Sequence, residues 1–366
     1  MANLPTMSLD PTLDNNGHDF YLPAVESTPL QLHTITTIAA LLELAPEWQA
    51  LSAALPLQSP FITPAWNILW WQHLHASRLL IHDRLNVFVL RDEQGQLRAV
   101  APMMTSIRPG LGGYGIKVLQ FFGADPNITE IRGMICQQEH ADAALVCLQT
   151  HLLKQQHRWD WIEWQGLNLA QMRQLSSPGV ASPKARVICY LPLPDQWETL
   201  KAGLSRNMKQ AIRKCFNTLK QAKHEAQLEV LDQRDQPAQF AQALATFFQL
   251  HRLRAKADEG VMHTDVFRSG KNHRFLAAYL QAAAQTDQVK IFQLSIDGKV
   301  VASRIGIGLG SDKQRQLYLY YSGYDTAWGA FSVMTTLVIL SLQWAIAQAY
   351  LGVNLSTGLD YAKQRW

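Results

Sequence analysis

The sequence of 366 residues predicts an α+β protein with two tandem halves, each a mixed, mostly antiparallel sheet flanked by helices. The chain is long enough for two domains at roughly 150 residues each. Apolar residues make up 48% of it and charged residues 17%, which indicates a large buried fraction. Both halves contain a hairpin followed by a strand, a helix and a strand, and this shared order indicates a weak duplication.

The chain is expected to begin with a leader and then divide once. Residues 1–33 are rich in Pro, Asn, Asp and Thr, which is typical of a flexible segment. The first half covers residues 34–193, and the second covers residues 194–366. The opening residues lack the basic and apolar regions of a signal peptide.

Local patterns predict the elements of the first half. Apolar residues recur at intervals of three and four in its first segment, as in an amphipathic helix. Thr63 is a typical N-cap and Pro64 a typical first helical residue, so a second helix begins there. A turn at Glu93-Gln94-Gly95 joins two strands. In order, we expect helices at 34–55 and 63–76, two strands within 85–104, a strand at 115–123, a helix at 139–156, and strands at 159–167 and 185–193.

The second half begins with helices and continues as a meander of strands. Asp297-Gly298 and Gly310-Ser311-Asp312 are strong hairpin signals between three predicted strands. The expected elements are a helix or helix pair at 197–226, a strand at 227–232, helices at 237–257 and 273–285, strands at 289–298, 299–310 and 314–325, a helix at 331–350 and a strand at 351–356. The apolar stripe expected on the first of these helices is Leu204, Met208, Ile212, Phe216 and Leu219.

No charged residue lies between Asp325 and Asp360. Residues 333–353 are therefore long enough to cross a bilayer, which takes about 20 apolar residues. Strand-like sequence on both sides favours instead a helix buried against a sheet, and polar side chains at bilayer depth would need partners. We predict no membrane span. The polar residues within this stretch are Thr335, Thr336, Ser341, Gln343 and Gln348.

Composition excludes several other classes of protein. The net charge of +4 is too small to indicate nucleic-acid binding. The four cysteines are scattered without a CxxC pair, which argues against a zinc site and against a disulfide framework. We therefore expect a cytoplasmic protein with no metal ligands.

Six short motifs, taken in order, carry a family resemblance. They are FITPAWNILWWQHL (61–74), LRAVAPMM (97–104), LSRNMKQAIRKCFNTLK (204–220), LHRLRAKADEG (250–260), LYLYYSGYDTAWGAFSVM (317–334) and VNLSTGLDYAKQRW (353–366). Over about residues 40–366 the chain resembles the CelD/BcsL-type acetyltransferases, a cellulose-biosynthesis-associated family of the GNAT superfamily. Fem-type aminoacyltransferases are related to that family.

The resemblance implies two GNAT-like halves, the first degenerate and the second holding the acyl-donor site. The implied activity transfers an acetyl or longer acyl group from acyl-CoA, or from an acidic acyl carrier protein, to an amine or hydroxyl. The acceptor would be a small molecule or a saccharide, as in exopolysaccharide synthesis, and no permanently bound cofactor is implied. Two alternatives remain open. A non-catalytic binding or scaffold protein is favoured by Asn354, which stands where an acid is common, and a Fem-like transferase would use aminoacyl-tRNA.

Acyl transfer of this type needs a base for the acceptor and an acid for the leaving thiolate. His251 is the first candidate base, because the pKa of a free imidazole is near about 6.5; a buried structural histidine is the alternative. Asp360 is the second, with a solvated loop acid as the alternative. Tyr324 ends a strand expected to face the donor and would protonate the thiolate, unless it is only a packed aromatic residue.

A phosphate site is expected where the charge-free helix begins. Small residues at this point leave backbone N–H groups open, which suits the phosphates of a coenzyme A donor, although a plain turn with a serine cap is the alternative. The expected cofactor-binding residues are Trp328, Gly329, Ala330 and Ser332. The expected substrate-binding residues are Lys363, Tyr320 and Arg254. Lys363 would bind an anionic group of the acceptor or donor; the alternative interpretation is an ordinary surface lysine.

A basic run extends from Lys201 to Lys223, with seven Lys or Arg and no acid. It is amphipathic, so one interpretation is a solvated helix face over the core. The other interpretations are contact with coenzyme A phosphates, with an acidic acyl carrier protein, or with tRNA. The run lacks the interleaved aromatic residues typical of single-strand binding, so nucleic acid is the least favoured partner.

Overall fold

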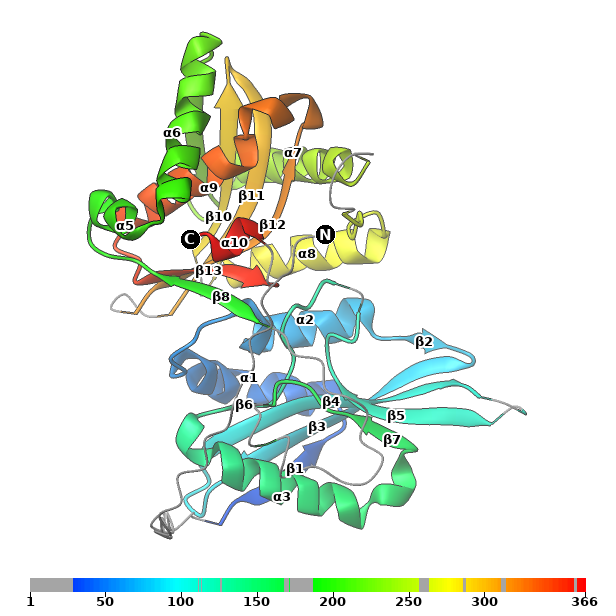
Figure 1. Cartoon of the computed structure of the whole chain (residues 1–366). Coiled ribbons are helices and arrows are strands. Elements are labelled where there is room, and N and C mark those ends of the chain that lie inside the picture. The colour runs from blue at the N-terminus through cyan, green and yellow to red at the C-terminus, as the bar shows by residue number, and fades with distance from the viewer. Residues whose placement is uncertain are drawn as a thin grey trace, which may run out of the picture.

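The computed structural model contains two mixed sheets, each with helices packed against it (Figure 1). This arrangement confirms the predicted α+β class. The structure describes residues 29–110, 112, 114–125, 127–167, 171, 187–256, 263–285, 288–310, 314–358 and 361–366.

The first sheet is built from the first half of the chain. Its strands are β1 (Gln31–Ile35), β2 (Ser77–Arg78), β3 (Ile81–Arg91), β4 (Leu97–Pro109), β5 (Gly115–Phe121), β6 (Ile135–Cys136) and β7 (Trp161–Glu163). They lie in the order β1-β3-β4-β5-β7, with β2 beside β3 and β6 beside β4. Its helices are α1 (Ile38–Ala53), α2 (Pro64–Leu74) and α3 (Ala141–Lys154), with short 3₁₀ turns at Pro60–Ile62, Gln138–His140 and Gln156–Arg158.

The second sheet lies in the order β8-β13-β12-β11-β10-β9. Its strands are β8 (Ile188–Pro192), β9 (Ala226–Asp232), β10 (Gln288–Ile296), β11 (Lys299–Leu309), β12 (Gln316–Tyr324) and β13 (Gly352–Thr357). Its helices are α5 (Trp197–Gly203), α6 (Arg206–Gln221), α7 (Pro237–Ala255), α8 (Gly270–Ala283), α9 (Val333–Ala347) and α10 (Tyr361–Gln364), and a 3₁₀ segment, η5, spans Thr326–Phe331.

The two halves share one connectivity, as the sequence predicts. In the first, the antiparallel meander β3-β4-β5 is followed by α3 and by β7, which pairs in parallel with β5. In the second, the meander β10-β11-β12 is followed by α9 and by β13, which pairs in parallel with β12. The helix in each case returns the chain to the same end of the sheet, as a parallel connection requires.

Three local predictions need correction. Residues 31–33, assigned to the leader, and residues 34–35, assigned to the first helix, form β1 instead. β8, expected to close the first half, pairs with β13 in the second sheet, a partner that its own pattern does not encode. Phe216 is 37% exposed, whereas its neighbour Cys215 is buried. Cys215 is buried because it lies on the side of α6 that packs against Ile339 of α9.

The charge-free helix α9 is buried between neighbours. It contacts β10 and β11 of the sheet and also α6, so it needs apolar residues around most of its circumference. Its buried hydroxyls bond within the helix: Ser341 Oγ donates to the Leu337 carbonyl at 2.7 Å, and Thr336 Oγ1 donates to the Ser332 carbonyl at 3.3 Å. No helix in the described part of the chain is long and apolar enough to cross a membrane.

One apolar core joins the two halves. Trp66 of α2 lies 1% exposed against Phe275 and Tyr279 of α8, with ring centroids 4.9 and 4.7 Å away, and against Tyr320 of β12 at 5.8 Å. Figure 1 shows α2 and α8 side by side between the sheets. Because this core is continuous, the first half packs directly against β12 and borders a site on that strand.

Candidate functional site

A cavity of about 1070 Å³ opens where β12 and β13 separate. The two strands pair only from Gln316 to Tyr318 on β12 and from Gly352 to Asn354 on β13. Beyond that point the strands diverge, and side chains from both strands line the space between them. The lining residues come from β12 (Tyr320, Tyr321, Ser322), β13 (Leu355, Ser356, Thr357), α7 (His251, Arg254), α9 (Met334, Thr335, Val338), the loop Asn127, Thr129 and Glu130, the C-terminal Gly358, Ala362, Lys363, Arg365 and Trp366, and Val187, His263, Thr264, Val266 and Arg304.

The tyrosine-rich strand holds a loop of the first half in place at this cavity. The Tyr320 hydroxyl donates to the Ile128 carbonyl at 2.5 Å, and the Tyr321 hydroxyl donates to the Asn127 carbonyl. Burial raises the pKa of Tyr321 well above its ordinary value, so the hydroxyl keeps its proton and remains a donor. The run of tyrosines therefore serves the contact between the halves.

Glu130 from that loop sits at the fork between the two strands. Its Oε2 accepts hydrogen bonds from the Tyr318 hydroxyl at 2.5 Å and from Ser356 Oγ at 2.7 Å, one from each diverging strand. Among the described residues that line the cavity, Glu130 is the one carboxylate. A carboxylate with two hydroxyl donors is well held and fixes the geometry of the fork.

The rest of the lining is strongly basic. Arg254 donates to Ser322 Oγ at 2.8 Å and to His263 Nε2 at 2.6 Å. Arg365 donates to Thr335 Oγ1 in the first turn of α9 at 2.9 Å, and Lys363 donates to the Thr357 carbonyl. With Arg304 these side chains place four permanent cations around a single carboxylate, an arrangement that attracts an anionic ligand.

His251 has the tautomer of a base. The ring is 3% exposed, and Nδ1 lies 3.1 Å from the Ser322 carbonyl. Because a carbonyl can only accept, Nδ1 carries the proton and Nε2 keeps its lone pair. Nε2 is buried, has no hydrogen-bond partner in the described part of the chain, and lies 4.0 Å from Asp265 Oδ1. Burial lowers the pKa of His251, which favours the neutral form.

A glycine sets the position of this histidine. A Cβ on Gly323 of β12 would lie 2.2 Å from the His251 backbone nitrogen and 2.5 Å from the Leu250 carbonyl carbon. Only glycine lets α7 approach the strand this closely. The close approach brings His251 and Arg254, one helical turn apart, to the same wall of the cavity.

Four of the residues nominated from the sequence meet in this cavity: His251, Arg254, Tyr320 and Lys363. Tyr324 does not line it and instead packs at 5.9 Å beneath the guanidinium of Arg254. Asp360 lies outside the described residues.

The segment expected to bind phosphate lies just before the cavity wall. Trp328, Gly329 and Ala330 belong to η5, and the glycine and alanine are exposed. Ser332 has a left-handed backbone (φ 54°) and begins α9, but the lining of the cavity starts at Met334. The basic run from Lys201 to Lys223, which spans α5 and α6, contributes no residue to this lining in the described chain, and most of its cations are exposed.

Sequence reasoning missed Glu130, Arg304 and Arg365. Glu130 lies in an irregular loop with no periodic pattern, and only tertiary contacts bring it to the fork. Arg365 lies two residues after Lys363, and the Lys-x-x-Trp ending could have drawn attention to it. Within the described residues no group of three or more His, Cys, Asp or Glu could hold a metal ion.

Comparisons with known proteins find a family model for part of the chain and a solved structure of similar fold. Residues 206–364 match the model of a family described as acetyltransferase (GNAT) domain. The chain is similar to a solved structure described as FemX, with a TM-score of 0.55, 10% identity and coverage of 90% of both chains. Such a likeness shows a shared fold, and the two sheets of common connectivity confirm the predicted arrangement of two tandem α+β halves.

Two further solved structures give lower scores. One is the C-terminal domain of a putative lysylphosphatidylglycerol synthetase from Agrobacterium fabrum, with a TM-score of 0.47, 11% identity and coverage of 88% of this chain and 80% of that chain. The other is a tandem GNAT protein from the clavulanic acid biosynthesis pathway, with a TM-score of 0.43, 8% identity and coverage of 91% and 90%. No curated protein matches the chain in sequence.

Proposed function

We propose that the chain is an acyltransferase that moves an acyl group from a thioester carrier, acyl-CoA or acyl carrier protein, to an amine or hydroxyl acceptor. The observation that carries the proposal is the cationic cavity between the diverging strands β12 and β13, with the neutral His251 among the residues of its wall. The match of residues 206–364 to a GNAT acetyltransferase domain supports the same reaction class.

The proposed step is a direct transfer. The acceptor nitrogen or oxygen attacks the thioester carbonyl carbon, the carbon–sulfur bond breaks, and the thiolate leaves with the bonding electron pair. The acceptor proton passes to Nε2 of His251, whose tautomer and lowered pKa suit a base at neutral pH. Tyr324 packs under Arg254 at the edge of this wall, and we retain it, with Asp360, as a proposed proton-transfer residue.

The donor phosphates would lie at the start of α9. Arg365 is hydrogen-bonded to Thr335 there, so a cation stands beside the positive end of a helix. Trp328, Gly329, Ala330 and Ser332 would border the same phosphates from the solvent side. Lys363 and Arg254 would hold the acceptor, with Tyr320 contributing only its ring because its hydroxyl is bonded to the Ile128 carbonyl, and the excess of cations supports an anionic acceptor.

The narrower assignment rests on the sequence motifs. The resemblance to CelD/BcsL-type acetyltransferases supports a saccharide acceptor in exopolysaccharide synthesis in the cytoplasm. A second candidate function keeps the same cavity but takes an aminoacyl group from aminoacyl-tRNA, as in Fem-type transferases. The structural likeness to FemX is the observation that favours it.

Ligand-induced stabilisation tests the proposal. The melting temperature is measured with acetyl-CoA and longer acyl-CoAs, for the natural chain and for Arg365→Gln. A ligand at 100 times its Kd should add about 2.7 kcal/mol to the natural chain, and clearly less to the variant. Arg268→Gln removes an equal charge at an exposed residue outside the cavity and serves as the control.

The donor classes give different results. Stabilisation by acyl-CoA that the cavity variant loses supports the first proposal. Stabilisation by an acyl carrier protein or by aminoacyl-tRNA alone would favour the corresponding donor. A protein that none of these ligands stabilises has lost the transfer reaction and fits the scaffold alternative.

A further inference from the structure

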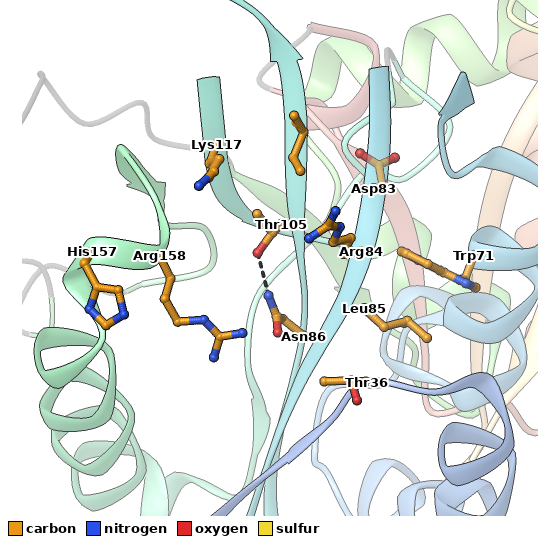
Figure 2. Close-up of a pocket in the computed structure, with 11 residues that line it drawn as sticks. Thr36, Trp71, Asp83, Arg84, Leu85, Asn86, Thr105, Lys117, His157 and Arg158 are labelled. Carbon is orange, nitrogen blue, oxygen red and sulfur yellow. Dashed lines mark hydrogen bonds between the residues drawn. The ribbon is translucent and has the colours of Figure 1, made fainter. Parts of the chain in front are cut away.

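A second cavity, of about 600 Å³, lies entirely within the first half of the chain (Figure 2). All its lining residues fall between Thr36 and Arg158. It shares no residue with the cavity between β12 and β13, although that cavity takes Asn127, Thr129 and Glu130 from the same half. Its volume is within the range of small-molecule sites, roughly 300–1,000 Å³.

Three cations from three separate elements surround this cavity. Arg84 comes from β3, Lys117 from β5 and Arg158 from the 3₁₀ turn after α3. Figure 2 shows them around the space in front of Thr105. None of the three forms a salt bridge within the described part of the chain. Among the described residues, Arg158 donates to the neutral amide oxygen of Gln155, at 2.7 Å.

Asp83 is the one carboxylate among the described residues that line this cavity, and its oxygens already have partners. Asp83 Oδ1 lies 3.0 Å from the guanidinium of Arg108 and accepts from Ser106 Oγ at 2.7 Å. Its Oδ2 accepts from the Ala76 backbone nitrogen at 2.6 Å. Asp83 therefore has its own cation, and it forms no salt bridge with Arg84, Lys117 or Arg158 among the described residues.

The floor of the cavity offers a hydrogen-bond donor. Asn86 and Thr105 are buried side by side on β3 and β4, 7% and 8% exposed. The Asn86 amide donates to Thr105 Oγ1 at 2.5 Å. Because this oxygen already accepts a hydrogen bond, the threonine hydroxyl is left to donate its own proton to a ligand.

We propose that this cavity binds the phosphate or diphosphate group of a small molecule. Like charges brought together repel, and a multiply charged anion between them removes that repulsion. Two of the three cations are guanidinium groups, whose planar donor pairs match phosphate oxygens. The buried threonine hydroxyl supplies a neutral donor at the base of the site. The ligand would be a second one, bound apart from the proposed acyl transfer.

Calorimetric titration with inorganic pyrophosphate and with inorganic phosphate tests the proposal. The background is Arg365→Gln, so that anion binding in the larger cavity is weakened. Adding Arg84→Gln or Lys117→Gln should weaken pyrophosphate binding at least about tenfold, as expected for the loss of a charged hydrogen bond. Adding Arg268→Gln, an equal loss of charge in the second half, should leave the affinity unchanged.

Three results of this titration would overturn the proposal or reassign the binding. It is overturned if the background protein binds neither anion, or if Arg84→Gln and Lys117→Gln change the affinity by less than about twofold. Equal weakening by Arg268→Gln would assign the binding to net charge and also overturn it. Arg84→Gln alone should keep the stabilisation by acetyl-CoA, so failure here and failure of the acyltransferase proposal are distinguishable.

Discussion

Replacing Gly323 by alanine tests how the structure positions His251. The added Cβ would lie 2.2 Å from the His251 nitrogen, 2.5 Å from the Leu250 carbonyl carbon and 2.7 Å from the His251 Cα. All three atoms belong to the backbone of α7, so no side chain can turn away to relieve the overlap. Ordinary contact begins near 3.4 Å, so the helix must retreat by roughly 1 Å.

Two measurable consequences follow from that displacement. Overpacking of this kind costs about 1–3 kcal/mol of unfolding free energy, which urea denaturation measures as a lower midpoint with an unchanged slope. A shift of about 1 Å in a catalytic group can also lower turnover by about 100-fold. The loss of turnover in Gly323→Ala should therefore be much larger than the loss expected from the small fraction of unfolded protein.

Gly203→Ala is the matched control. This glycine ends α5, and a Cβ there meets no atom within 4 Å, so the variant should be neutral or slightly more stable. The reasoning is refuted if Gly323→Ala unfolds at the same urea concentration as the natural chain. It is also refuted if both variants lose the same stability.

Four further predictions concern the same cavity. His251→Ala and Asp360→Asn should each lower turnover at least about tenfold in steady-state assays, and unchanged turnover in both would remove them from the mechanism. Because burial lowers the pKa of His251, the acidic limb of the kcat/KM profile should lie below pH 6.5 and vanish in His251→Ala. Because the pKa of His251 is lower in the folded than in the unfolded chain, the stability that neutral His251 contributes is lost as the pH falls through the folded-state pKa. Urea denaturation at pH values between 7 and 5 would show this loss as a falling free energy of unfolding. Glu130→Ala leaves two hydroxyls without their acceptor and should cost at least about 2 kcal/mol, whereas Tyr318→Phe should cost about 1 kcal/mol; equal losses in urea denaturation would contradict this account.

Local sequence patterns were sufficient for most elements, and they selected four residues that the structure places around the cavity. The N-cap Thr63 accepts a hydrogen bond from the Trp66 nitrogen as predicted, and the charge-free helix is buried between a sheet and a helix. His251 and Lys363 were found from residue chemistry and from motifs that resemble a known family. Both inferences depend on neighbours within a few positions along the chain, where helical and strand periodicities are set.

Long-range pairing decided the rest. β8 pairs with β13 in the second sheet. Tyr320 of β12 binds a loop of the first half through the Ile128 carbonyl, and Glu130 accepts a hydrogen bond from Tyr318, 188 residues away in the sequence. The composition of an irregular loop carries no signal of its distant partner. Such contacts form because two halves bury one continuous core, and that packing exists only once the whole chain is folded.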